Sequence, residues 1–193
     1  HRFFIEENAN VKYTEKHYAE GAGDGRKILN PYTEINLGKN ASMTMDSVQI
    51  KGVTSTKRIT KATIEEGATL VIKEKILTSN DQSAKTSFIV DLKGDGASCE
   101  VTSRSVATDN SYQEFKSNVT GDKNCYAHVS CDAIIKDDAK VKAVPEIYAK
   151  NASANLIHEA YIGKRQGEQL MKLMSLGLSE KQAEEEIIKG FLK

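Results

Sequence analysis

The sequence of 193 residues has no tryptophan, only two prolines and only three cysteines. Three cysteines are an odd number, and because their spacing is irregular they argue against a disulfide framework. They fit a reducing compartment better, so the sequence predicts a cytoplasmic protein. A cysteine with a function in such a protein acts as a thiol or as a metal ligand.

Neither sign of charge is in excess, because 27 basic and 27 acidic side chains are mixed along the chain. This balance excludes the basic surface that nucleic acid or an anionic membrane would require. No apolar run approaches the roughly 20 residues that a membrane-spanning helix needs. Residues 1–7 lack the apolar run of a signal peptide, and the start at His1 rather than Met leads us to expect a fragment or a trimmed chain.

The sequence does contain a short unit that recurs seven times. In each copy a Gly, Asn or Asp is followed by Ala, or once by Cys, and then by apolar or small residues at every second position. Gly, Asn and Asp tolerate the positive φ of a tight corner, and alternation with period two buries one face of a strand. Each copy therefore predicts a turn followed by a strand. The copies begin at Asn8-Ala9, Asn40-Ala41, Gly67-Ala68, Gly96-Ala97, Asn124-Cys125, Asp138-Ala139 and Asn151-Ala152.

The copies recur every 27 to 32 residues, and near the end of the chain this interval is halved to 13 or 14. A strand-rich repeat of this length without helices between the copies is typical of a parallel β-helix, and two strands per turn explain the halving. Intervening strands are expected at 53–59, 86–92 and 112–119. An antiparallel sandwich is the alternative, since it also consists of many short strands. A left-handed hexapeptide helix is disfavoured because no apolar repeat at every sixth position persists.

After Ala160 the pattern changes from strand-like to helical. The spacing predicts a helix over 165–176 that ends at Gly177 in a left-handed cap. Ser179 and Gln182 then have the spacing of a capping box and open a second helix.

The sequence therefore divides into two parts. Residues 1–160 are predicted to form a parallel β-helix core, and residues 161–193 are predicted to form a C-terminal helical hairpin. The fold class is mainly β.

The C-terminal part also carries motifs of a known family. From about Ser98 to Phe191 the chain resembles the SufB/SufD family, which supplies scaffold proteins of the SUF iron–sulfur cluster assembly machinery. The resemblance implies a right-handed parallel β-helix between helical terminal regions. It rests on Pro145-Glu146-Ile147-Tyr148, His158-Glu159-Ala160, Gly177-Leu178-Ser179, Ala183 and Gly190-Phe191.

The resemblance implies three site residues. Cys131 matches the cysteine of the SufB-type Cys-Asp motif, which accepts a cluster or sulfur. His158 matches a histidine that in the SufD-type partner faces this cysteine across a subunit interface, and Glu159 matches a SufB-type glutamate. Cys131 and His158 are therefore predicted as metal ligands, and all three residues as contacts of a transient iron–sulfur cluster.

The repeat brings two of these residues together by a separate route. Cys131 stands six positions after Cys125, and His158 stands six positions after Ala152, the second residues of their copies. We therefore expect them in one column on adjacent turns, about 4.8 Å apart along the stack, at the rim of the apolar face. A thiolate beside an imidazole suits iron or a cluster. The equivalent positions in earlier copies are Glu15, Ser47, Glu74 and Ser103.

The cysteines also have a purely structural interpretation. A lone cysteine on an apolar strand face is commonly a small core residue, and a histidine beside it is commonly a hydrogen-bonded structural group. Cys99 and Cys125 occupy inward positions and are expected in the core. The spacing Cys125-x-x-His128-x-x-Cys131 resembles a metal motif, but in a strand His128 faces away from both cysteines, so a joint site is not expected.

The function predicted on these grounds is a scaffold for iron–sulfur cluster assembly rather than an enzyme. A homodimer is the first expectation, and a heterodimer with another SufB/SufD-type chain is the second. Docking of an ABC-type ATPase subunit is not expected, because family members continue into a further helix that contributes to it. A carbohydrate-active β-helix enzyme would need paired carboxylates and aromatic residues on one face. A structural paralogue that binds a partner but no cluster is the remaining alternative.

Overall fold

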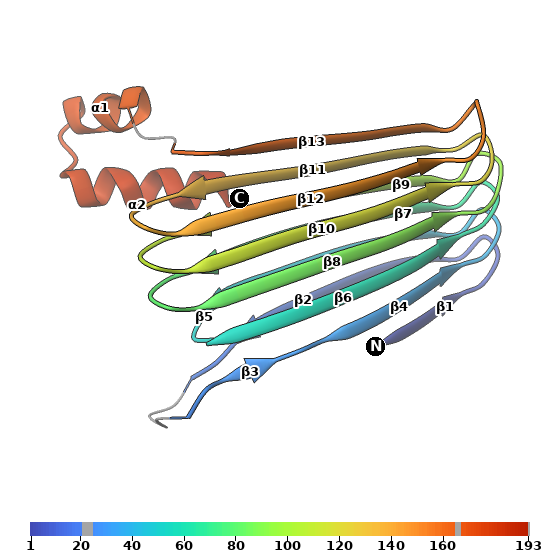
Figure 1. Ribbon diagram of the computed structural model, residues 1–193, viewed down its shortest axis with the longest axis horizontal. Helices are drawn as coiled ribbons and strands as arrows, with labels where there is room; N and C mark the ends of the chain where they lie inside the picture. Colours follow the sequence, from blue (N-terminus) through green and yellow to red (C-terminus); the bar gives the residue numbers. More distant parts are fainter. Residues whose placement is uncertain (21–24, 165–166, 193) are drawn as a thin grey trace.

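The computed structural model describes residues 1–20, 25–164 and 167–192. In this part of the chain two parallel sheets face each other, and a pair of helices lies at one end of the strands (Figure 1). Sheet A consists of β1 (Arg2–Ile5), β3 (Ile28–Leu29), β4 (Tyr32–Leu37), β6 (Ser55–Ile64), β8 (Ser83–Leu92), β10 (Tyr112–Gly121) and β12 (Lys140–Ala149). Sheet B consists of β2 (Asn10–Tyr18), β5 (Ser42–Lys51), β7 (Thr69–Thr78), β9 (Ser98–Ala107), β11 (Tyr126–Ile135) and β13 (Asn155–Gly163).

From β4 onward, successive strands alternate between the two sheets. Within sheet B the order is β13-β11-β9-β7-β5-β2, and sheet A follows the order β1-β4-β6-β8-β10-β12. The strand pairs are parallel in both sheets. This topology confirms the parallel β-helix and shows that the antiparallel alternative is wrong. The three intervening strands expected from the sequence are β6, β8 and β10.

The corners of the solenoid follow the turn chemistry expected from the repeat. Asn8, Asn40, Gly67 and Gly96 have positive φ, and each directly precedes the alanine of its copy. Just after such a corner the N–H of the alanine donates a hydrogen bond to a carbonyl oxygen three residues earlier. For Ala41 the distance from this nitrogen to that oxygen is 3.0 Å. At these four corners a residue that tolerates the left-handed region marks where the turn begins. The last three copies differ, because Asn124, Asp138 and Asn151 do not have positive φ, and Asp137 has it in place of Asp138.

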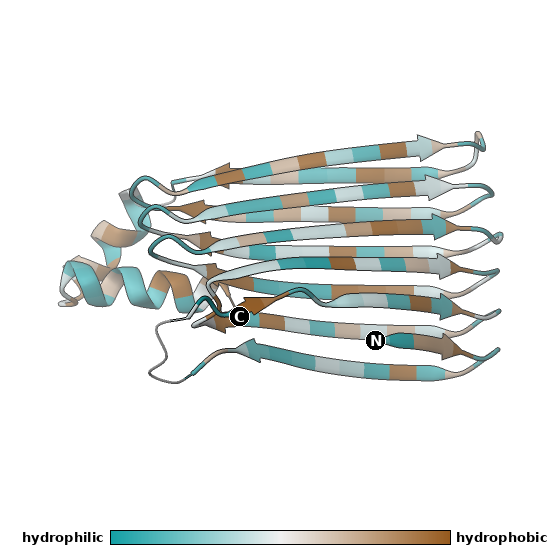
Figure 2. Ribbon diagram, turned by 60° about the horizontal axis from the view of Figure 1, so that its bottom comes forward, coloured by the Kyte–Doolittle hydropathy of each residue, from teal (hydrophilic) through white to brown (hydrophobic). Residues whose placement is uncertain are grey.

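The core lies between the sheets and is built from the inward faces of both. Figure 2 shows hydrophobic and hydrophilic residues alternating along the strands, as period-two burial requires. Phe88 is 2% exposed, and its ring centroid lies 5.7 Å from that of Phe115. Other fully buried side chains in this core are Ile35, Leu37, Met43, Met45, Ile64, Leu70, Ile72, Leu92, Val90 and Val101.

Strand β13 continues to Gly163, beyond the boundary expected at residue 160. It does so because Tyr161 to Gly163 extend the parallel ladder against Asp132 to Ile134 of β11. Periodicity alone did not show this, since pairing with a neighbouring strand decides where a terminal strand ends.

Two helices follow, α1 (Gly167–Ser175) and α2 (Glu180–Phe191). The start expected at Arg165 lies outside the described residues. Gly177 has a φ of +97°, and Ser179 and Gln182 form the expected capping box, so both cap predictions are confirmed. Lys136 Nζ of the solenoid lies 2.5 Å from Glu184 Oε2 of α2. In the described part of the chain no helix is both long and apolar enough to cross a membrane.

Candidate functional site

Five residues form one column through the interior of the solenoid, on the inward face of sheet B. The register pairs Glu15 with Ser47, Ser47 with Glu74, Glu74 with Ser103, and Ser103 with Cys131. We call these residues the interior polar column. All five side chains are buried. The column expected from the repeat is thus confirmed up to Cys131, but it lies inside the solenoid and not at the rim of the apolar face.

His158 does not continue this column. The register pairs Cys131 with Ala160 and His158 with Val129, so the expectation of one column for Cys131 and His158 is wrong. Tyr126 pairs with Asn155, which makes Ala154, and not Ala152, the equivalent of Cys125. The turn before β13 contains two more residues than the repeat spacing suggested, and a turn can absorb such an insertion without disturbing the ladder.

Cys131 and His158 nevertheless lie diagonally across two adjacent strands on the same inward face. The strand spacing places their Cα atoms about 8 Å apart. His158 points toward sheet A, where its ring centroid lies 6.4 Å from that of Phe115. The structure therefore brings a thiol and an imidazole to one side of the last two strands of sheet B.

Glu159 faces the opposite way. Its Oε2 lies 3.4 Å from His128 Nε2 on the outward face of sheet B. The structure therefore does not bring Glu159 together with Cys131 and His158 within one chain. His128 faces away from Cys125 and Cys131, which are both buried, so the orientation expected for His128 is confirmed. Cys99 is also buried in the core, as expected.

The thiol of Cys131 is held in its protonated form. Burial, together with the negative charges of Glu74 and Asp132, raises its pKa to about 12. The side chain borders a small interior cavity of about 10 Å³, which Glu74, Ser103 and Phe115 also line. A cavity of this volume holds about one water-sized species. Metal binding at this sulfur would therefore release a proton, since the thiolate is the ligand form.

The imidazole of His158 is held neutral. Burial, together with the nearby His128, lowers its pKa. Both ring nitrogens are buried, and neither has a hydrogen-bond partner among the described residues. A buried polar atom without a partner is unfavourable, and a neutral imidazole is the form that binds metals. His158 thus has two buried ring nitrogens that make no hydrogen bond to the described residues, on an imidazole in the form that can bind a metal ion.

The sequence did not reveal the ion network around Glu15 and Glu74, in the N-terminal part of the interior polar column. Arg58 of β6 reaches across the interior from sheet A and donates a hydrogen bond from Nη1 to Glu15 Oε1. Its Nε lies 3.5 Å from Glu74 Oε1, and its Nη2 lies 2.6 Å from His17 Nδ1. Ser103 donates a hydrogen bond of 2.9 Å to Glu74 Oε2. Alternation within β6 places Arg58 at an inward position, and this could have indicated the network. A charged side chain at an inward position is, however, ordinarily an argument against a strand.

The two carboxylates in this network titrate differently. Burial opposes ionisation of Glu15, but the Arg58 guanidinium and its hydrogen bond outweigh burial and lower the Glu15 pKa. For Glu74 burial outweighs Arg58 and the hydroxyl donors, so the Glu74 pKa is raised from 4.5. The guanidinium therefore favours the ionised form of Glu15, whereas burial makes ionisation of Glu74 less favourable than that of a free carboxyl.

The raised pKa of Glu74 predicts a pH-dependent stability. A carboxyl whose pKa is higher in the folded state stabilises the fold most below its unfolded pKa, and this contribution is lost as pH rises through the folded pKa. Glu74→Gln cannot ionise and keeps an amide oxygen for Ser103. Relative to the wild type, we expect this variant to gain stability as pH rises from about 5 to about 8, by up to about 1.4 kcal/mol per unit of pKa shift. Urea denaturation across this pH range measures the difference, and parallel stability curves for the two proteins would contradict it.

The last turn of the solenoid is open on one side. β12 and β13 are the edge strands at the C-terminal end of the two sheets, so their outer backbone groups have no neighbouring strand in the described chain. Exposed apolar residues gather on these strands, namely Ile147, Tyr148, Ile157, Tyr161 and Ile162. An unpaired edge with exposed apolar side chains is a surface on which another chain can add.

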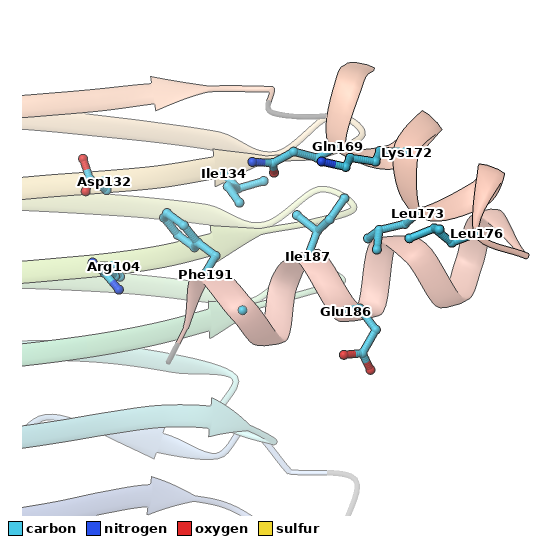
Figure 3. Close-up of a pocket in the computed structure, with 11 residues that line it drawn as sticks. Arg104, Asp132, Ile134, Gln169, Lys172, Leu173, Leu176, Glu186, Ile187 and Phe191 are labelled. Carbon is cyan, nitrogen blue, oxygen red and sulfur yellow. The ribbon is translucent and has the colours of Figure 1, made fainter. Parts of the chain in front are cut away.

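A larger cavity, of about 530 Å³, lies between the helices and the end of sheet B. Figure 3 shows Leu173, Ile187 and Phe191 from the helices and Ile134 from β11 around it. Cys131 and His158 do not line this cavity. It is therefore separate from the pair on the inward face.

No group of three or more His, Cys, Asp or Glu side chains stands in metal-binding geometry within residues 1–20, 25–164 and 167–192. One chain therefore supplies Cys131 and His158 as only two donors on the inward face. An iron species held there would need further donors from sulfide, solvent or another chain.

The stacked parallel strands and the open final turn define a solenoid protein of the β-helix class. A family model described as "SUF system FeS cluster assembly, SufBD core domain" matches residues 2–191, and the chain belongs to this family. It is 30% identical over 190 residues to an iron–sulfur cluster assembly SufBD family protein of Methanocaldococcus jannaschii, covering 97% of this chain and 60% of the relative. It is 32% identical over 194 residues to a SufBD family protein of Pyrococcus horikoshii, covering 97% of this chain and 57% of the relative. The chain thus spans somewhat more than half the length of these relatives.

Proposed function

We propose that this chain is a scaffold in iron–sulfur cluster assembly, and that it holds iron and sulfur species near a subunit interface. Family membership supports a role in cluster assembly. The observation that carries the finer proposal is the pair formed by the buried Cys131 thiol and the unpartnered His158 imidazole, both on the inward face beside the open last turn. Iron and sulfide are cargo in this proposal and not a resident cofactor.

The two donors suit this cargo by their chemistry. A thiolate is a soft ligand that prefers iron–sulfur species, and an imidazole also binds iron. His158 is ready to bind because its pKa is lowered, whereas Cys131 must first lose its proton. Binding is therefore coupled to proton release. That coupling would let the site hold its cargo reversibly instead of permanently.

We further propose that two chains associate through β12 and β13. These strands combine unpaired edges with exposed apolar side chains, and edge strands readily pair with another chain. One chain carries both Cys131 and His158, so a homodimer is the simplest assembly. A heterodimer with another SufB/SufD-type chain would use the same edge. That this chain does not dock an ABC-type ATPase subunit stays a prediction.

Anaerobic reconstitution with iron and sulfide tests the site. We expect Cys131→Ala to bind at least roughly tenfold less iron and sulfide than the wild type. Loss of an outer-shell partner of a metal ligand can cause a loss of that size, and this variant would lose the ligand itself. Cys125→Ala is the matched control, because Cys125 is a buried cysteine in the turn directly before β11 and outside the site, and it should retain uptake. Iron and sulfide assays with visible absorption spectra provide the measurement.

Equal uptake by the wild type and Cys131→Ala would reject the site. A wild-type protein that stays colourless after reconstitution would instead favour the structural paralogue that binds a partner but no cluster. The mass of the wild-type protein in solution separates monomer from dimer, and a monomer would contradict the homodimer.

A further inference from the structure

The cavity between the helices and the end of sheet B has the size and the lining of a small-molecule site. Its volume of about 530 Å³ falls in the range of roughly 300–1,000 Å³ that ligand pockets have. Alternation along β11 places Ile134 on the outward face of sheet B, yet Ile134 is only 4% exposed. Figure 3 shows Ile187 and Phe191 of α2 pointing toward it. The helices therefore enclose an apolar space over this end of the sheet.

Gly190 keeps part of this space open. It lines the cavity and lies within α2, where glycine is among the least favourable residues for a helix. A Cβ added to Gly190 would meet no heavy atom within 4 Å beyond its chain neighbours and the backbone of its own helix. A larger side chain at this position would therefore fit without a clash and would fill the cavity.

The charged side chains of the lining favour an anion. Neither the Arg104 side chain of β9 nor the Lys172 side chain of α1 makes a hydrogen bond or an ion pair in the part of the chain that the structure describes. Asp132 is the register neighbour of Arg104 and supplies one negative charge. Glu186 is paired with Lys189 at 2.7 Å, and its carboxylate points to the other side of α2 in Figure 3. The lining thus carries one positive charge in excess.

We propose that this cavity binds a small amphipathic carboxylate. Its apolar body lies against Ile134, Ile187 and Phe191. Its carboxylate accepts hydrogen bonds from the Arg104 guanidinium, whose planar fork matches two carboxylate oxygens, and Lys172 adds a second positive charge. Because Arg104 stands on the outward face of sheet B, this site is separate from the two donors on the inward face and does not depend on the proposed function.

Octanoate tests the site, and 1-octanol and octylammonium serve as ligands with the same chain length and a different head charge. Isothermal titration calorimetry of the intact chain at neutral pH measures each affinity. We expect octanoate to bind at least roughly tenfold more tightly than either comparison ligand, because hydrogen bonds to a charged group contribute enough for that ratio. Arg104→Met should remove this preference. Arg2→Met is the matched control, because Arg2 lies on β1 at the other end of the stack, and it should keep the preference.

Gly190→Leu should abolish octanoate binding, because the new side chain occupies the apolar space. Gly167→Leu is its matched control, since Gly167 is also a helical glycine with open space around it but does not line the cavity. It should bind octanoate as the wild type does, and circular dichroism should show the same fold for all variants.

Three results would overturn the proposal. These are a wild type that does not bind octanoate, a wild type that binds 1-octanol as tightly, and a Gly190→Leu protein that binds octanoate as the wild type does. A wild-type dimer that dissociates on Gly190→Leu would also overturn it, because the cavity would then hold part of a second copy of the chain. Failure of cluster uptake would reject the proposed function and leave the octanoate result untouched.

Discussion

Replacing Arg58 with methionine is expected to lower the free energy of unfolding by about 3–5 kcal/mol. The Arg58 side chain is 3% exposed and interacts with both Glu15 and Glu74 across the interior. Without the guanidinium, two buried carboxyls lose their positive partner. Breaking a buried ion network on one side leaves an uncompensated charge, which is far less favourable than losing the whole network. Chemical denaturation followed by circular dichroism measures the change.

Arg2→Met is the matched control for this experiment. Arg2 also pairs with a glutamate, Glu34 at 3.3 Å, but its side chain is 72% exposed. An exposed pair contributes about 0–1 kcal/mol, so the control should lose no more than that. Converting Glu15 and Glu74 to glutamine together with Arg58→Met should restore part of the stability, because no charge is then left buried. Equal losses in Arg58→Met and Arg2→Met would show that the interior network does not stabilise the solenoid.

Replacing Phe88 with alanine is expected to lower the free energy of unfolding by about 3–5 kcal/mol as well. Phe88 is 2% exposed in the middle of the stack. Its ring packs at 5.7 Å from Phe115, whose own ring lies 6.4 Å from His158. The variant loses the transfer free energy of the buried ring. It also leaves a cavity that the rigid strands on both sides cannot close. Thermal and chemical denaturation measure the loss.

The same variant should also affect the site at conditions where it remains folded. Phe115 loses its support on one side, so His158 becomes less well positioned and iron uptake should fall. Phe4→Ala is the control, because Phe4 is 69% exposed and a surface substitution changes stability by about 0.5 kcal/mol or less. A Phe88→Ala loss as small as that of Phe4→Ala would contradict the packing described for the core.

The two faces at the end of sheet B differ in their chemistry. The inward face offers a protonated thiol and a neutral imidazole. On the outward face, Glu159 Oε2 lies 3.4 Å from His128 Nε2. A single strand, β13, contributes His158 to one and Glu159 to the other because neighbouring residues of a strand point to opposite faces. Within one chain, His158 and Glu159 therefore face opposite sides of the sheet.

The sequence by itself determined the corners and the inward faces. Asn40 and Gly67 mark turns because few other residues accept positive φ, and Leu70 and Ile72 mark a buried face because their spacing matches the strand period. These are local properties, so one sequence is enough to show them. The regular interval between the copies then predicted the solenoid, and the motif around His158 indicated the family.

Only the tertiary structure decided the relations between distant strands. The turn before β13 holds two additional residues, which moved His158 from Cys131 to Val129 in the register. Arg58 meets Glu15 and Glu74 because two sheets face each other, and His128 meets Glu159 because a parallel neighbour lies beside it. Such contacts depend on loop lengths and on strand pairing over long separations, and the alternation within a strand carries no information about either.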